Sequence, residues 1–149
     1  MPTPTSAANI VCPRCHKTNR VPSARRDEEP RCGACKSPLF GQGPIALDDS
    51  SFQKHAERSD IPLLVDFWAA WCGPCRVMAP AFERAATAFE GRVRFAKVDT
   101  DASPAVSQRF RIQSIPTMIL FQGGREVART SGALSADQIQ KWLTSQHAA

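Results

Sequence analysis

The sequence contains no long apolar run and little that would direct the chain to a membrane. Among its 149 residues there is no stretch of about 18 consecutive apolar residues, so no membrane-spanning helix is expected. Residues 1–9 include neither a basic segment nor an apolar core, so we expect no secretory signal and a cytoplasmic protein. The N-terminal basic residues have no aromatic neighbour before Phe40, which disfavours a stacking surface for single-stranded nucleic acid.

Cysteine, in contrast, is plentiful. All six cysteines occur in pairs separated by two residues, a spacing that a scattered framework of disulfides would not produce. In a reducing compartment such pairs are more often metal ligands or catalytic thiols than structural disulfides. The pairs are Cys12 with Cys15, Cys32 with Cys35, and Cys72 with Cys75.

The composition divides the chain into two parts. Residues 1–40 carry seven basic residues against three acidic ones, and seven of the twelve prolines lie within residues 1–44. The segment Ser37–Pro44 has the glycines and prolines of a linker. We therefore expect a small cysteine-rich module over residues 1–40 and a larger domain over residues 41–149.

In the larger part, apolar strands alternate with amphipathic helices, which predicts an α/β fold with a central mixed sheet flanked by helices. Two capping boxes indicate helix starts, and a Gly-Gly pair indicates a two-residue hairpin turn. These signals are Ser50 with Gln53, Ser135 with Gln138, and Gly123-Gly124. The expected strands cover 44–47, 63–68, 92–98, 117–121 and 125–130, and the expected helices cover 50–58 and 72–90 (capped by Gly91) and begin at Ser103 and Ser135.

The pair Cys72 and Cys75 lies where an expected strand gives way to a helix. The positive end of a helix stabilises a thiolate, so Cys72 is expected to be a nucleophile that attacks a disulfide. Cys75, three residues further on, then attacks the mixed disulfide and releases the reduced partner. The alternatives for this pair are a zinc half-site and a structural disulfide.

The residues around this pair resemble the thioredoxin family over residues 44–149. The resemblance rests on the run VDFWAAWCGPC at 65–75, on Pro80, on SIPT at 114–117, and on Gly123, Gly124 and Gly132. It implies the thioredoxin fold and a monomeric protein-disulfide reductase that binds no organic cofactor directly. Its partners would be disulfide-containing client proteins and a thioredoxin reductase that draws electrons from NADPH.

The resemblance also implies roles for single residues. The matching proline, Pro116, is cis and packs beside the disulfide, although sequence alone favours a trans bond. Ile115 would offer its backbone to a substrate strand. The apolar surface that receives substrates would consist of Trp71, Gly73, Pro74, Ile115 and Gly132.

Asp66 lies inside an apolar run, where burial should raise the pKa of its carboxyl group. A protonatable acid near the cysteines can accept the proton of Cys75. The resemblance assigns that role to Asp66 and makes Lys97 its partner. The alternative is a buried Asp66–Lys97 ion pair with a packing role.

The four N-terminal cysteines have the spacing of a zinc site. Two C-x2-C pairs separated by sixteen residues match a four-thiolate signature, and four sulfurs complete a tetrahedron without an open position. We therefore expect a small zinc-ribbon-like module with one structural Zn²⁺ on Cys12, Cys15, Cys32 and Cys35, which would supply folding energy that so short a module lacks. This part is similar to the amino-terminal extension of the bacterial thioredoxin 2 group. The alternatives are His16 as a competing ligand and two disulfides.

Three further hypotheses compete with the reductase or extend it. A disulfide oxidase or isomerase is disfavoured by Gly73-Pro74, since more oxidising relatives carry other dipeptides between the cysteines. A nucleic-acid or protein binder would use the basic module, but four thiolates and one Zn²⁺ contribute −2 and lower the net charge from +5 to +3. Oxidation of the zinc thiolates would release the metal and regulate the reductase.

Two further histidines, His55 and His147, lie among polar residues in the sequence. We expect both side chains to be exposed to solvent.

Overall fold

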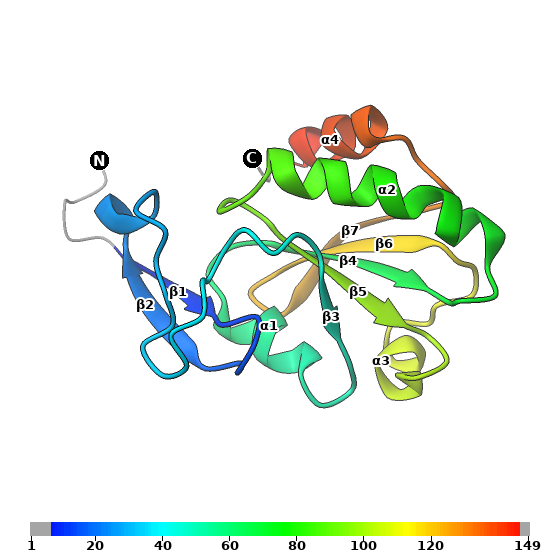
Figure 1. Cartoon of the computed structure of the whole chain (residues 1–149). Coiled ribbons are helices and arrows are strands. Elements are labelled where there is room, and N and C mark those ends of the chain that lie inside the picture. The colour runs from blue at the N-terminus through cyan, green and yellow to red at the C-terminus, as the bar shows by residue number, and fades with distance from the viewer. Residues whose placement is uncertain (1–6, 147–149) are drawn as a thin grey trace.

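A five-stranded mixed sheet forms the centre of the larger part in the computed structural model, which describes residues 7–146 (Figure 1). Strands β3, β5 and β4 run parallel to one another, and β6 and β7 continue the sheet in antiparallel pairings. This arrangement confirms the expected α/β class. In spatial order the strands are β3 (Ile45–Leu47), β5 (Arg94–Asp99), β4 (Leu63–Trp68), β6 (Thr117–Gln122) and β7 (Arg125–Ser131).

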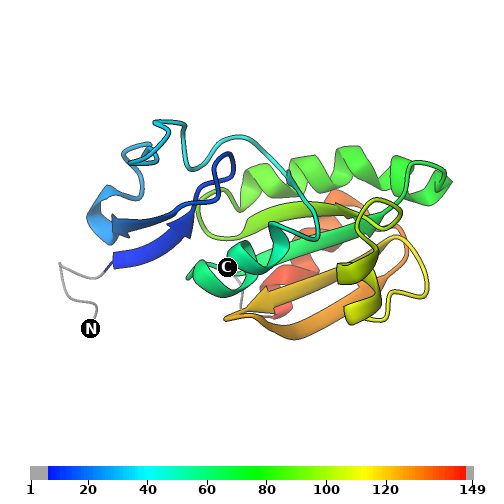
Figure 2. The ribbon, with the colours of Figure 1, turned by 90° about the horizontal axis from the view of Figure 1, so that it is seen from below.

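Helices cover both faces of this sheet (Figures 1 and 2). On one face lie α2 (Gly73–Ala88) and α4 (Ala136–Ser145), and on the other lie α1 (Phe52–Arg58) and α3 (Pro104–Arg109). No helix within residues 7–146 is long and apolar enough to cross a membrane.

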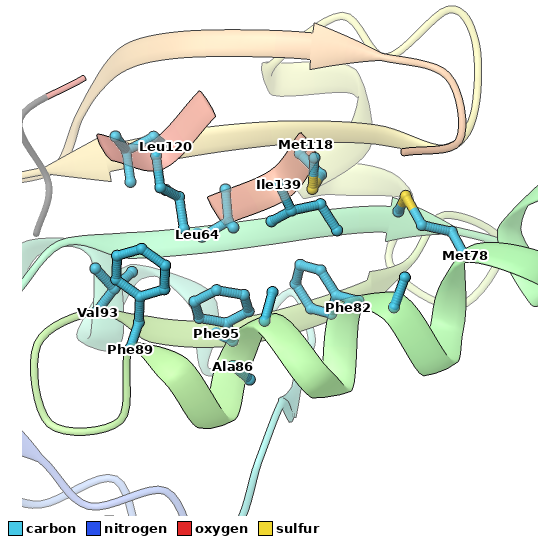
Figure 3. Close-up of a cluster of buried hydrophobic side chains, with 13 residues drawn as sticks. Leu64, Met78, Phe82, Ala86, Phe89, Val93, Phe95, Met118, Leu120 and Ile139 are labelled. Carbon is cyan, nitrogen blue, oxygen red and sulfur yellow. The ribbon is translucent and has the colours of Figure 1, made fainter. Parts of the chain in front are cut away.

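Alternate residues of β4 build the two cores. Leu64 faces α2, where Phe82 and Phe95 pack with ring centroids 4.9 Å apart (Figure 3). Val65 and Phe67 point to the opposite face, beneath α1 and α3. Each such side chain contributes about 1.5–3 kcal/mol by its burial. The strand is therefore fixed from both sides, as is typical of a central strand with a near-continuous apolar run.

Two local signals of the sequence are confirmed. The Ser135 hydroxyl accepts a hydrogen bond from the Gln138 N–H (3.2 Å), and the Gln138 side chain accepts one from the Ser135 N–H (2.9 Å). Gly123 and Gly124 join β6 to β7 with φ of 60° and 80°, values that glycine adopts without strain.

The start of α1 differs from the expectation. The helix begins at Phe52 with Ser51 at the N-cap, and the box of Ser50 with Gln53 does not form. Asp48 is the reason, because its Oδ1 accepts hydrogen bonds from the backbone N–H groups of Ser50 (2.9 Å) and Ser51 (3.0 Å). The chain therefore completes a turn before the helix begins.

The connection between α2 and β5 is longer than expected. α2 ends at Ala88 and β5 begins at Arg94, each two residues inside the expected boundary. A turn occupies the difference: the Arg92 N–H donates to the Phe89 carbonyl (2.9 Å), and Gly91 takes a φ of +82°.

The N-terminal part forms a small layer beside the sheet (Figure 1). No strand was expected here, but the structure contains an antiparallel hairpin. Its elements are β1 (Ala7–Val11), β2 (Thr18–Pro22) and the short 3-10 helix η1 (Ser23–Arg25). Ile10 and Leu39 pack against Ile61, which follows α1, so this layer shares an apolar contact with the larger domain.

A buried arginine joins the two parts. Arg94 at the start of β5 is only 4% exposed, and its guanidinium donates to the carbonyls of Leu39 (2.7 Å) and Val11 (3.4 Å). The same group lies 5.2 Å from the centroid of the Phe40 ring. Burial lowers the pKa of Arg94 to about 10, so the side chain is still charged at neutral pH. Arg94 therefore satisfies N-terminal carbonyls with a charged donor from the central sheet.

The expectation that His55 is exposed is wrong. Its side chain is 1% exposed, and Nε2 lies 3.0 Å from Nδ1 of His16, within hydrogen-bonding distance. Burial lowers the pKa of His55 to about 3, which keeps the imidazole neutral at pH 7. The polar sequence around His55 misleads because the N-terminal layer covers this side of α1. His147 lies outside the described residues.

We predict that Arg94→Met destabilises the protein by about 2–3 kcal/mol, because the carbonyls of Leu39 and Val11 lose a buried charged donor while the apolar stem is retained. Urea unfolding followed by circular dichroism measures the change. Arg84→Met, on the exposed face of α2, is the matched control and should shift stability by less than about 0.5 kcal/mol. Equal stability of the two variants would contradict the role given to Arg94.

Candidate functional site

The C-terminal end of β4 and the start of α2 place the cysteine pair. Cys72 is the N-cap of α2, and its Sγ accepts a hydrogen bond from the Cys75 N–H at 3.2 Å. The two cysteines form a disulfide with Cα atoms 5.3 Å apart. In the reduced state a thiolate at Cys72 would meet the positive end of a sixteen-residue helix. The sequence-predicted position at a strand-to-helix junction is therefore observed.

A hollow of about 490 Å³ opens beside the disulfide. Cys72 borders it, although only 4% of that residue is exposed, and Cys75 lies deeper at 2%. Trp71, Pro74 and Ile115 give the hollow apolar walls. Of the residues expected to receive substrates, Trp71, Gly73, Pro74 and Ile115 line this hollow.

The Ile115–Pro116 peptide bond is cis, as the resemblance implied. This places the Ile115 carbonyl oxygen 3.8 Å from the Sγ of Cys72. Gly132 does not line the hollow, but its N–H donates to the Pro116 carbonyl at 2.9 Å. Its φ of +97° is one that glycine adopts without strain. Gly132 therefore stabilises the loop at Ile115 and Pro116 through this backbone hydrogen bond.

Asp101 holds the indole of Trp71. The Nε1–H of Trp71 donates to Oδ2 of Asp101 at 2.9 Å, although the tryptophan is 69% exposed. Sequence reasoning did not identify Asp101. A signal was present, because Trp71 and Asp101 follow β4 and β5, and neighbouring parallel strands end at the same edge of a sheet.

Asp66 is a buried carboxyl group without a partner. It is 0% exposed, and neither carboxylate oxygen has a hydrogen-bond partner within the described residues. Because Asp66 is two residues beyond Leu64 on β4, it faces the α2 side of the sheet. Burial raises the pKa of Asp66 to about 7, against the opposing charge of Lys97.

Lys97 is adjacent to Asp66 in the strand register but does not form an ion pair with it. Its Nζ lies 4.5 Å from the centroid of the Trp68 ring, a cation–π contact. In residues 7–146 the one ion pair closer than 4.0 Å joins Arg129 and Glu126. Lys97 therefore acts on Asp66 through space rather than by direct contact.

The four N-terminal cysteines converge. Their Sγ atoms all lie within 4.8 Å of one another, with 3.6 Å between Cys12 and Cys35 and 3.5 Å between Cys15 and Cys32. A tetrahedral zinc ion with Zn–S bonds of about 2.3 Å needs sulfurs about 3.8 Å apart. The donor set therefore fits a four-thiolate zinc ion. His16 is outside this set and faces His55 instead.

Both cysteine pairs fold into the same turn. The N–H of His16 donates to the Cys12 carbonyl, and the N–H of Lys36 donates to the Cys32 carbonyl, each at 3.0 Å. His16 and Lys36 take almost equal φ values of 64° and 66°. Hydrogen bonds from the Cys35 N–H and then the Asn19 side chain lower the pKa of Cys32 to about 6. The second turn thus favours the thiolate form of Cys32.

Comparisons with known proteins agree with both parts of the chain. Residues 43–145 match the family model described as Thioredoxin, and residues 11–37 match the one described as Thioredoxin 2, N-terminal. Thioredoxin C-3 of Corynebacterium nephridii is 44% identical over 137 residues, which cover 92% of this chain and 94% of that protein.

Two shorter matches involve the larger domain. A thioredoxin of Alicyclobacillus acidocaldarius is 48% identical over 99 residues, which cover 66% of this chain and 93% of that protein. The bifunctional thioredoxin reductase/thioredoxin of Mycobacterium leprae is 47% identical over 89 residues, which cover 60% of this chain and 19% of that protein.

Asp66 gives the protein a pH-dependent stability. The carboxyl group titrates near 3.8 when unfolded and near 7 when folded, so its contribution to stability is present at low pH and is lost as the pH rises from about 4 to 7. Asp66→Asn should therefore gain roughly 2–3 kcal/mol over the wild type between pH 5 and pH 8.5.

Chemical denaturation at both pH values measures this difference. Asp137→Asn, on the exposed start of α4, is the control and should show the same gap to the wild type at both values. A pH-independent gap for Asp66→Asn would contradict the raised pKa.

Proposed function

The chain belongs to the thioredoxin family of protein disulfide oxidoreductases, with an N-terminal part of the Thioredoxin 2 type, and from this we propose that it reduces disulfides of client proteins through Cys72 and Cys75. One observation carries the proposal. A cysteine at the N-cap of α2 borders an apolar hollow, while its partner cysteine lies behind it in the first helical turn. A structural disulfide would need no such access.

The first step uses Cys72. Its thiolate attacks one sulfur of the client disulfide and forms a new S–S bond, and the other client sulfur leaves as a thiolate that takes a proton from water. The end of α2 stabilises the attacking thiolate. The Cys75 N–H at 3.2 Å from the Cys72 sulfur supports the same charge.

The second step uses Cys75. Its sulfur, once deprotonated, attacks the Sγ of Cys72 and forms the disulfide seen in the structure, and the client's remaining sulfur leaves as a thiolate. Two electrons pass from the protein to the client. We assign Asp66 as the acceptor of the Cys75 proton, because a pKa of about 7 suits proton transfer near neutral pH. Lys97 is a positioning residue that limits the rise of this pKa.

The substrate surface follows from the same hollow. We assign Trp71, Gly73, Pro74 and Ile115 to contacts with the client segment, and Pro116 and Gly132 to the loop that shapes it. A thioredoxin reductase using NADPH would regenerate the dithiol. The Mycobacterium leprae relative, whose name joins both activities in one chain, supports that pairing.

We further propose one structural Zn²⁺ on Cys12, Cys15, Cys32 and Cys35, within a module over residues 1–40 that precedes the domain over residues 41–149. Gly41 and Gly43, both with positive φ, support a linker at this boundary. We also propose that the protein acts as a monomer in a reducing compartment, the cytoplasm, where cysteine pairs are more often metal ligands than disulfides.

Insulin reduction with NADPH and thioredoxin reductase tests the electron-transfer proposal. Cys72→Ser should lose at least about a thousandfold in rate, because the attacking thiolate is removed. Cys75→Ser should instead accumulate a mixed disulfide with insulin, visible on a non-reducing gel. Full activity of Cys72→Ser would refute the assignment.

Zinc content tests the metal proposal independently of activity. Metal analysis by mass spectrometry should find one zinc per chain in the wild type and in Cys72→Ser. Cys32→Ser should lose the metal and several kcal/mol of stability, since metal binding supplies folding energy to this module. A zinc content that is unchanged in Cys32→Ser would exclude the four-cysteine site.

A further inference from the structure

The hollow beside the disulfide continues past the catalytic residues. A second hollow of about 470 Å³ shares Thr100, Ile112 and Gln113 with the first. Together they form one groove, called here the client groove, that runs from Cys72 to Arg111 after the end of α3.

The client groove changes character along its length. Beside the disulfide its walls are apolar, from Trp71, Pro74 and Ile115. At the far end they are polar and include Gln108 and Arg111. A ligand that fills the whole groove therefore needs an apolar part near its reacting sulfur and a polar part further away.

Arg111 is a cation without an acidic partner. Its side chain is exposed, and among residues 7–146 no carboxylate lies within 4.0 Å of it. Asp101 lines the same hollow, but its carboxylate accepts the indole N–H of Trp71. The far end of the client groove therefore offers an unpaired guanidinium.

The backbone at Arg111 favours another residue. The Arg111 N–H donates to the Gln108 carbonyl (3.1 Å) and the Ile112 N–H donates to the Ser107 carbonyl (3.0 Å), which is the Schellman arrangement at a helix end. The position requires positive φ, and Arg111 has +53°. Glycine is usual there because it adopts this conformation without strain. His16, Glu29 and Lys36 share this positive φ, so it is the position of Arg111 in the client groove that distinguishes it.

We propose that Arg111 is a specificity-determining residue that binds a carboxylate side chain of the client segment. This rests on the proposed reductase function, since the same segment carries the cysteine that reacts at Cys72. The groove follows residues 111–115, and the Ile115 carbonyl oxygen lies 3.8 Å from the Cys72 sulfur. A client segment that follows residues 111–115 one for one would place its carboxylate roughly four residues from the client cysteine.

Arg111 is exposed to solvent, and this limits how strongly it can favour acidic clients. A guanidinium binds a carboxylate through two parallel hydrogen bonds, but exposed pairs are weakened by water and salt. We expect acidic clients to react about three- to tenfold faster than basic ones at low ionic strength.

Peptides activated as pyridyl disulfides test the proposal. Each carries one cysteine and a Glu, Gln or Lys four residues before or after it, and the release of thiopyridone reports the rate of reaction with the reduced full-length protein. The wild type should prefer Glu over Lys on one side of the cysteine, and 0.5 M NaCl should weaken the preference. Arg111→Gln should abolish the preference, and Arg111→Glu should reverse it.

Two control variants distinguish binding by Arg111 from a general effect of charge and from a purely structural role at the end of α3. Arg125→Glu makes the same charge change as Arg111→Glu, but Arg125 starts β7 and lies at the end of β6 that is far from Pro116. This variant should keep the preference for Glu over Lys. Arg111→Gly should lose the preference without a lower melting temperature, because glycine relieves the positive φ. A role of Arg111 confined to the end of α3 would leave all peptides equal in every variant.

Equal rates for the Glu and Lys peptides in the wild type, or a preference that survives Arg111→Gln, would overturn the proposal. The Gln peptide reports on the reductase itself. If it reacts no faster with the protein than with a simple thiol, the proposed function fails, whatever the other peptides show.

Discussion

Strand β4 is buried on both faces and pairs with β5 on one side and β6 on the other, and the position of every group in the candidate site depends on it. Asp66 lies on this strand, and the chain that leaves it becomes the N-cap of α2 at Cys72. Its parallel neighbour β5 ends beside it and leads to Asp101, and its antiparallel neighbour β6 begins beside it, directly after Pro116. Three segments distant in sequence therefore meet at one edge of the sheet, because the strands that carry them are hydrogen-bonded in register.

The cysteine-rich module attaches at the other end of the same sheet. Arg94 starts β5 and donates to the carbonyl of Val11, next to Cys12 of the four-cysteine cluster, whereas Asp99 ends the strand on the side of the disulfide. Six extended residues separate these ends by roughly 17 Å. The four-cysteine cluster and the Cys72–Cys75 disulfide therefore lie toward opposite ends of β5. The module contacts the larger domain through two polar contacts: His16 covers His55, and Arg94 donates to the Leu39 carbonyl.

The elements that could be predicted are those for which the cause is local. The apolar run of β4, the Gly123-Gly124 turn and the box at Ser135 each carry enough information within a few residues.

The predictions failed where a more distant or competing partner decides. The capping box at Ser50 does not form because the Asp48 side chain accepts a hydrogen bond from the Ser50 N–H. His55 is not exposed because the N-terminal module covers it. Lys97 does lie next to Asp66 in the strand register, but the alternative of a direct ion pair is not observed, because the ammonium group of Lys97 packs over the ring of Trp68 instead. The cis bond before Pro116 came from family resemblance, since no local rule favours it.

Two positions at the functional edge break local rules. Asp66 is a carboxyl group without a hydrogen-bond partner in the described structure, in a core that is otherwise apolar, and Arg111 has the backbone of a glycine. Either feature destabilises the fold, and neither improves packing. A carboxyl group that titrates near pH 7 is nevertheless suited to moving the proton of a second thiol, and an unpaired guanidinium is suited to a carboxylate that arrives with a client. The strands at this edge of the sheet are stable and keep the geometry of the site. The few unfavourable groups beside them can react or bind a ligand because they have no hydrogen-bond or ion-pair partner within the described protein.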